Sequence, residues 1–196
     1  GRNLRVPPSA GWRGCRKRVS GEREGLLAAR DVRSGMTETS GRVARAFRDH
    51  DSFDRVDEGR FETTTTTFDA IVEATERDGR IEYVVRVRAP SLSAAVESDV
   101  AAVVEEGWLE TFELRVADAD GAVRGEHDID PAVDLTADEI VVTFTFTDIN
   151  ERRGVDDAAA LVNYVEGTYV QGLIPGYEYV DPVAGLVDRA RQAGGR

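Results

Sequence analysis

The chain has 196 residues and is acidic, with 37 Asp and Glu residues, 25 basic residues and a formal net charge of −12. Its single cysteine, Cys15, excludes an intramolecular disulfide. No apolar run approaches the roughly 18 residues needed to cross a bilayer. The sequence therefore excludes the disulfide-stabilised and membrane-spanning classes, and its length favours one principal domain.

The basic residues are almost all arginine, because Lys17 is the only lysine. An acidic chain with so little lysine suits a protein that stays soluble in concentrated salt, since carboxylates hold water well and the lysine stem adds apolar surface. At molar salt the Debye length falls to about 3 Å, which screens the repulsion among the carboxylates. The composition predicts a halophilic cytoplasm; the alternative is an ordinary acidic protein from a GC-rich genome.

Residues 1–35 differ in charge from the rest of the chain. They contain nine basic and three acidic residues, whereas residues 36–196 contain sixteen basic and thirty-four acidic residues, a net charge of −18. The boundary falls at Met36, the only methionine. We predict a basic, disordered extension over 1–35 and a single acidic domain over 36–196. Three interpretations of the extension stay open: residues upstream of a natural start at Met36, an ordinary tail, or an arm that binds nucleic acid.

The first predicted elements are a helix and a hairpin. Residues 40–50 carry an N-cap, Ser40, and apolar residues one turn apart, which predicts a short helix. Residues 51–59 are predicted to be an acidic loop. Two alternating segments, 61–75 and 81–89, flank an Asp-Gly pair, which is a strong signal for a β-hairpin.

The middle of the chain predicts a helix, a strand and a loop. Ser93 can cap a helix with apolar residues at 96, 100, 103 and 104, and Gly107 is a suitable residue to end it. Residues 109–117 alternate and predict a strand. Residues 122–138 are acidic and poor in apolar residues, which predicts a loop or a short extra strand.

The clearest patterns lie between residues 139 and 179. Residues 139–147 alternate between apolar residues and a face that is mostly threonine, which predicts a strand with one partly solvated side. The helix that follows is expected to be capped by Asp156 or Asp157 and to end before Pro175. Its apolar stripe consists of Ala158, Val162, Val165, Tyr169 and Leu173. Asp181 and Pro182 predict the start of a last short helix.

These elements predict an α+β fold. Hairpins favour an antiparallel sheet of four to five strands, with helices packed mainly on one face. The expected order is α-β-β-α-β-β-α-α.

The sequence predicts no catalytic, cofactor-binding or metal residues. His50 and His127 are the only histidines, and neither lies in a metal-binding array. His127 lies beside Glu126, Asp128 and Asp130, and such a group could form an acid–base cluster. Asp148 precedes Glu151, Arg152 and Arg153 in a loop between strand and helix, where functional residues often occur. Solvation of acidic loops and local ion pairs are the alternative interpretations.

Three segments resemble a family of small acidic haloarchaeal proteins of unknown function. They are residues 61–75, the Val-Thr-Phe-Thr-Phe-Thr-Asp run at 142–148, and Gly-Leu-Ile-Pro-Gly-Tyr-Glu-Tyr at 172–179. The resemblance extends over about residues 36–190. It implies a haloarchaeal cytoplasmic protein that starts at Met36, and it assigns no catalytic residue.

The order of elements also resembles the type III secretion chaperone-like fold, whose dimers bind other proteins. This resemblance is topological only, and the predicted elements include two strands, not three, before the central helix. Fold alone does not establish function.

We expect a non-enzymatic protein-binding module with chaperone- or adaptor-like behaviour, with a protein or a second copy of itself as partner. The candidate surface consists of Tyr164, Tyr169, Tyr177 and Tyr179, for which core packing is the alternative. The second hypothesis is a small-molecule-binding protein or enzyme that uses acidic loop residues near His127 or Asp148. The negative charge of residues 36–196 argues against nucleic acid as a partner of that part.

Overall fold

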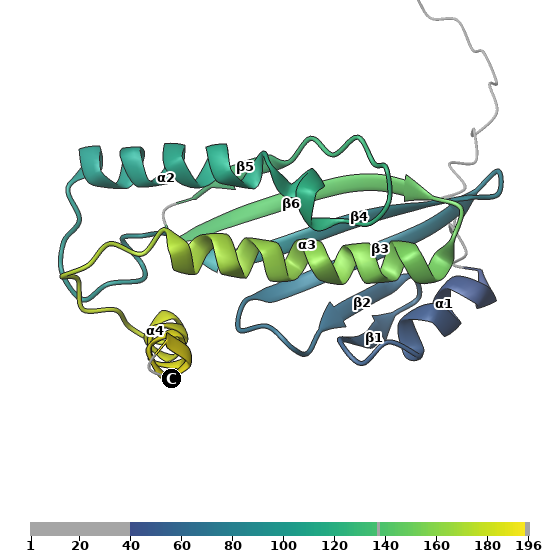
Figure 1. Cartoon of the computed structure of the whole chain (residues 1–196), viewed down its shortest axis with the longest axis horizontal. Coiled ribbons are helices and arrows are strands. Elements are labelled where there is room, and N and C mark those ends of the chain that lie inside the picture. Colours follow the sequence, from purple (N-terminus) through teal and green to yellow (C-terminus); the bar gives the residue numbers. More distant parts are fainter. Residues whose placement is uncertain (1–39, 137, 195–196) are drawn as a thin grey trace, which may run out of the picture. The chain divides into compact units, whose positions relative to one another are not determined.

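The computed structural model describes residues 40–136 and 138–194 (Figure 1). The predictions for residues 1–35 and for Met36 lie outside these residues. The described part contains four α-helices, one turn of 3-10 helix and six β-strands. In chain order they are α1 (Gly41–Arg48), β1 (Phe53–Asp57), β2 (Arg60–Thr63), β3 (Asp69–Arg77), β4 (Arg80–Pro90), α2 (Ala102–Val116), η1 (Ala119–Ala122), β5 (Ala132–Leu135), β6 (Glu139–Asp148), α3 (Glu151–Gln171) and α4 (Val183–Gly194).

All six strands form one antiparallel sheet in the order β1-β2-β3-β4-β6-β5. The α+β class is therefore confirmed, whereas the predicted four to five strands and the predicted element order were wrong. The central pair, β4 and β6, is joined along ten residue pairs from Ile81↔Asp148 to Pro90↔Glu139. This register places Asp148 at the end of the central strands, beside the start of α3.

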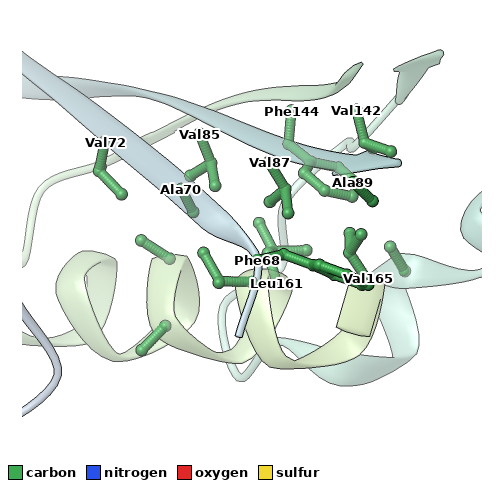
Figure 2. Packing of buried hydrophobic residues seen from close by; sticks show 14 of the residues in the cluster. Phe68, Ala70, Val72, Val85, Val87, Ala89, Val142, Phe144, Leu161 and Val165 are labelled. Carbon is green, nitrogen blue, oxygen red and sulfur yellow. The ribbon is translucent and has the colours of Figure 1, made fainter. Parts of the chain in front are cut away.

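Alternation along the strands builds the core. The inward residues of β3, β4 and β6 are buried, and α3 lies lengthwise across them (Figure 1). Figure 2 shows these side chains directed toward Leu161 and Val165 of α3. The opposite face of β6 carries the threonines, and Thr145 and Thr147 are exposed there, which confirms the partly solvated face.

Two strands differ from the predictions. Residues 51–59 contain β1, of which only Phe53 is buried, so this edge strand lacks the alternation by which a strand is recognised. Residues 61–75 form two strands, β2 and β3, separated by bends at the threonine run. Thr67 and Phe68 donate their backbone N–H groups to Glu166 of α3, which ties this turn to the helix.

The predicted strand at 109–117 lies, up to Val116, in helix α2, and the helix predicted from Ser93 begins only at Ala102. Trp108, Phe112 and Val116 are buried at four-residue spacing, which is helical periodicity. The alternation at 112, 114 and 116 was misleading, because Leu114 is 67% exposed. Gly107 lies inside α2 and does not end a helix. Ser93 instead donates its hydroxyl to Glu105 of α2.

The helices predicted near residues 40–50 and after Pro182 are confirmed as α1 and α4. The predicted stripe of α3 is buried at four of its five residues, with Leu173 partly buried beyond the helix end. None of the helices in the described part is both long and apolar enough to cross a bilayer.

Two core tyrosines predict an alkaline limit to stability. Burial raises the pKa of Tyr83 and of Tyr169 well above the ordinary value of 10.0. Because the native pKa is the higher one, stability is complete below pH 10 and is lost above it. We expect a loss of about 1.4 kcal/mol per pH unit for each tyrosine. In a titration followed by tyrosinate absorbance, Tyr83 and Tyr169 should ionise only as the circular dichroism of the fold disappears; ionisation of all five tyrosines in the folded state would contradict this.

Candidate functional site

Three ionisable side chains from three separate segments meet beneath the surface. His127 belongs to the segment between η1 and β5, Asp148 ends β6, and Asp157 lies in the second turn of α3. The imidazole Nε2 of His127 lies 2.9 Å from Asp157 Oδ2 and 3.7 Å from Asp148 Oδ2. The side chains of the two aspartates are at most 1% exposed and that of His127 is 4% exposed. We call these three residues the His–Asp cluster.

The local sequence explains why both aspartates point inward. Asp148 continues the buried alternation of β6 directly after Phe144 and Phe146. Asp157 lies on the buried stripe of α3, three residues after Gly154 and four before Leu161. The expected cap at Asp156 or Asp157 was wrong, because Asn150 is the N-cap and its side chain accepts from the Arg153 N–H. The helix thus begins at Glu151, so Asp157 lies inside it and its side chain takes part in the His–Asp cluster.

Arg153 neutralises Asp148. Its Nε and Nη2 atoms donate to the two carboxylate oxygens at 2.7 and 2.6 Å, and the Asn150 N–H donates to the same carboxylate. Burial alone raises the pKa of Asp148, but the hydrogen bonds from Arg153 and the backbone outweigh it and hold that pKa below the usual value. Asp148 therefore stays ionised despite its burial.

Asp157 anchors the segment that carries His127. The backbone N–H groups of Arg124 and Gly125 donate to its two oxygens at 2.8 and 3.0 Å. Gly125 lies against the imidazole, since a Cβ atom at this position would be 2.2 Å from His127 Nε2. The absence of a side chain at residue 125 is therefore what lets the segment place its imidazole on Asp157.

A surface cleft of about 410 Å³ opens above the cluster. His127 and Asp148 line it, together with Glu126 and three arginines: Arg80, Arg124 and Arg153. Arg80 donates to Thr147. Arg153 uses Nε and Nη2 for Asp148, and its Nη1 makes no hydrogen bond to the described residues. The cleft also lies at the N-terminus of α3, where helix dipoles favour negative charge.

The structure joins the two loops that the sequence offered as separate candidates. His127 and Asp148 share the cluster, whereas Glu126, Asp128 and Asp130 are exposed and do not pair with the imidazole. Sequence reasoning missed Asp157 as a functional residue. The signal was its position among the buried residues of the α3 stripe, where a carboxylate requires a partner. The other histidine, His50, lies 3.5 Å from the half-exposed Asp156.

The four tyrosines of the predicted interaction surface lie in different environments. Tyr169 is fully buried and donates to the Pro90 carbonyl, and Tyr164 donates to the Arg115 carbonyl. Tyr177 and Tyr179 line one apolar groove of about 360 Å³ beside α4. The structure therefore brings together Tyr177 and Tyr179 but places Tyr169 in the core.

A larger hollow of about 610 Å³ lies over β2, β3 and β4. Its arginines are Arg60, Arg86 and Arg88, and the first two are paired with Glu73 at 3.4 and 2.8 Å. No histidine lines this hollow. It therefore offers charge but no imidazole, unlike the cleft above the His–Asp cluster.

Removal of Arg153 is expected to make the fold sensitive to acid. The native pKa of Asp148 lies below the ordinary value of 3.8, so its contribution is present above that pH and is lost as the pH falls through the native pKa. In Arg153→Gln the buried carboxylate loses its cation and its pKa rises. The midpoint of acid unfolding, followed by tryptophan fluorescence, should move to higher pH. An unchanged midpoint would show that Arg153 does not hold Asp148 in its charged form.

The comparisons with known proteins identify the family. Residues 48–189 match a family described as a family of unknown function, DUF5813. No curated protein and no solved structure matches the chain. The prediction of an uncharacterised family is confirmed; haloarchaeal origin and the type III secretion chaperone-like resemblance stay predictions. Since the match covers well over half of the sequence, the chain belongs to the DUF5813 family.

Proposed function

We propose that this domain binds a small anionic molecule in the cleft above the His–Asp cluster, and that His127 exchanges a proton with it. The observation that carries the proposal is the buried imidazole, 2.9 Å from Asp157, at a cleft lined by three arginines. Burying two carboxylates and an imidazole costs free energy, and such groups gather more often at functional sites than elsewhere.

The charges of the cleft favour an anionic ligand. Arg80, Arg124 and Arg153 supply guanidinium groups, which bind carboxylates and phosphates through paired hydrogen bonds. The cleft also contains two carboxylates, Glu126 and Asp148, so its arginines outnumber its acidic residues by three to two. The N-terminus of α3 adds a partial positive charge. The buried Asp148 is already held by Arg153, so it repels an anion less than a free carboxylate would.

The imidazole supplies the chemistry. Asp157 holds the ring by its Nε2 atom, as an orienting carboxylate does in acid–base sites. Because Nε2 faces Asp157, a bound ligand with a titratable oxygen or nitrogen exchanges its proton with the other ring nitrogen, Nδ1. If the ligand only binds and exchanges a proton, the protein is a ligand-binding protein. If the bound ligand is also converted into a product, the protein is an enzyme.

Thermal shift measurements with acetate, malonate, phosphate and sulfate test the proposal. A ligand that binds only the folded state raises the melting temperature, and the stabilisation grows with the logarithm of the ligand concentration divided by the dissociation constant. At least one anion should stabilise the wild type and should stabilise Arg80→Gln much less. Arg77→Gln is the matched control, because Arg77 is exposed on the same hairpin and does not line the cleft. If no anion acts, or if both variants lose the effect equally, the proposal is wrong.

A second candidate function is protein binding, with a second copy of the chain as the partner. Two apolar grooves of about 370 and 360 Å³ have Ile174 in common. Val103, in the first groove, is 74% exposed, and Tyr177 and Tyr179 line the second. Apolar surface of this kind is typical of interaction sites, and symmetric dimers are the commonest oligomers.

Light scattering with size exclusion tests the dimer. Glu106, Glu110 and Glu113 are exposed on α2, so two copies that meet through this helix repel each other in dilute buffer. We expect a dimer in molar KCl and a monomer at low salt. Val103→Asp should abolish the dimer, whereas Val56→Asp, on an exposed position of the edge strand β1, should not. A strict monomer in molar KCl would remove this candidate.

We also propose that the protein works in a salt-rich cytoplasm. The net charge of −18 over residues 36–196, with arginine as the only basic residue there, supports this proposal. Self-repulsion of that charge lowers stability in dilute buffer, and salt relieves it. The free energy of unfolding should therefore rise from dilute buffer to molar KCl. Equal stability in both would leave an ordinary acidic protein as the better interpretation.

A further inference from the structure

The His–Asp cluster contains one more negative charge than it has permanent cations. Two buried carboxylates, Asp148 and Asp157, are matched by the single guanidinium of Arg153. The imidazole of His127 carries a charge only when it is protonated. An unpaired buried charge is costly, and a metal ion would supply a second cation here.

The donor atoms lie close enough together to bind one metal ion. One nitrogen and two oxygens, from three different residues, lie within 4.8 Å of one another. Donors bound at about 2.1 Å to one ion lie about 3 Å or more apart, which compares with 2.9 and 3.7 Å for His127 Nε2 and the two carboxylates. An imidazole with carboxylates is a ligand set that Zn²⁺ and Mn²⁺ accept.

Hydrogen bonds hold the carboxylates in place for this role. Asp157 accepts from two backbone N–H groups, and Asp148 accepts from the Asn150 N–H and from Arg153. Such bonds orient ligating groups in metal sites. Asp148 Oδ2 accepts from Arg153 Nε at 2.7 Å and has a second lone pair for an ion, while Oδ1 keeps its bonds to Asn150 and to Arg153 Nη2. His127 and Asp148 both line the cleft, which gives an entry path and room for further ligands.

We propose that His127, Asp148 and Asp157 bind a divalent transition-metal ion, of the Zn²⁺ or Mn²⁺ class, with positions left open toward the cleft. The ion binds His127 at Nε2 and supplies the second cation of the cluster. This deepens the proposed function by naming a cofactor for the same site, since an anion in the cleft can complete the coordination. The metal site does not require that ligand, because the three protein donors are already together.

Titration calorimetry with Zn²⁺ and Mn²⁺, in chloride buffer free of other anions, tests the proposal. One ion should bind per chain, and Mg²⁺ should bind much more weakly. His127→Gln should weaken binding by about 10- to 100-fold or more. This variant leaves Asp148 with Arg153 and Asp157 with two backbone donors, so the fold should persist. His50→Gln is the matched control, since these are the only two histidines in the chain.

NMR resonances of the imidazole nitrogens of the two histidines give a second measurement. A change in stability without metal binding would not shift the Nε2 resonance of His127 selectively. Stoichiometric Zn²⁺ should shift the Nε2 resonance of His127 and leave His50 unchanged. No binding, binding that shifts only His50, or equal affinity in wild type and His127→Gln would overturn the metal site. The anion screen is run both with and without a metal chelator. Anion binding in the presence of the chelator tests the proposed function alone, and metal binding in the absence of added anions tests the metal site alone.

Discussion

Gly154→Ala should be among the most destabilising single substitutions in this protein. A Cβ atom at residue 154 would lie 2.4 Å from the ring of Tyr83, where α3 crosses the sheet. Tyr83 is fully buried and stacked on Phe146, and its hydroxyl donates to the Glu151 carbonyl, so the ring has no space to move. Overpacking of this kind costs about 3 kcal/mol. Chemical denaturation of the purified variant measures the loss.

Gly167→Ala provides the matched control in the same helix. A Cβ atom at residue 167 would have nothing within 4 Å, so only the helix propensity changes. Alanine in place of a helical glycine should stabilise the protein by about 0.5–1 kcal/mol. Opposite signs for the two variants are the expected result. If Gly154→Ala were also stabilising, the close packing of α3 on Tyr83 would be wrong.

Asp157→Ala is expected to cost roughly 3–5 kcal/mol. The substitution leaves the N–H groups of Arg124 and Gly125 without their acceptor and removes the 2.9 Å contact of His127. The segment between η1 and β5 then loses its anchor on α3. Faster hydrogen exchange should appear first in residues 123–131, and denaturation gives the free energy.

Asp156→Ala is the control for that variant. Asp156 is adjacent in sequence, but its side chain is 45% exposed and its contacts to His50 and Arg124 are long, at 3.5 and 3.7 Å. Exposed ion pairs contribute at most about 1 kcal/mol. Equal losses in the two variants would show that Asp157 acts through general helix effects and not through the His–Asp cluster.

The sequence predicted the centre of the fold well. The alternation of β6 and the stripe of α3 are long and regular, so local periodicity was enough to recognise them. The hairpin of β3 and β4 followed from Asp78 and Gly79, which both adopt positive φ.

The edges of the fold were harder to predict. Only one residue of β1 is buried, so this strand depends on backbone pairing with β2 and leaves little trace in the sequence. Helix α2 carries exposed apolar residues, Val103 and Leu114, beside the buried Trp108 and Phe112. Because apolar residues occur on both sides of the helix, its 3.6-residue periodicity is weak, and a strand was predicted over residues 109–117.

The candidate site required the fold. His127 and Asp148 were each noted in their own loops, but nothing local places them near one another. Pairing of β5 with β6, and the hydrogen bonds from Arg124 and Gly125 to Asp157, bring them to within 3.7 Å. Asp157 was interpreted as a helix cap because the true start, at Asn150, lies two turns earlier. The sequence pattern alone does not decide whether Asp157 caps the helix or is buried on the stripe of α3.

The central claim is that the cleft above the His–Asp cluster binds a small anion. An amide NMR titration of the chain with malonate tests it most directly, because each backbone N–H reports its own surroundings. We expect saturable shifts confined to residues 124–127, 147–153 and 80. Shifts confined to the arginine hollow at Arg60 and Arg88, or to the groove at Tyr177, would contradict the claim, as would a spectrum that malonate leaves unchanged.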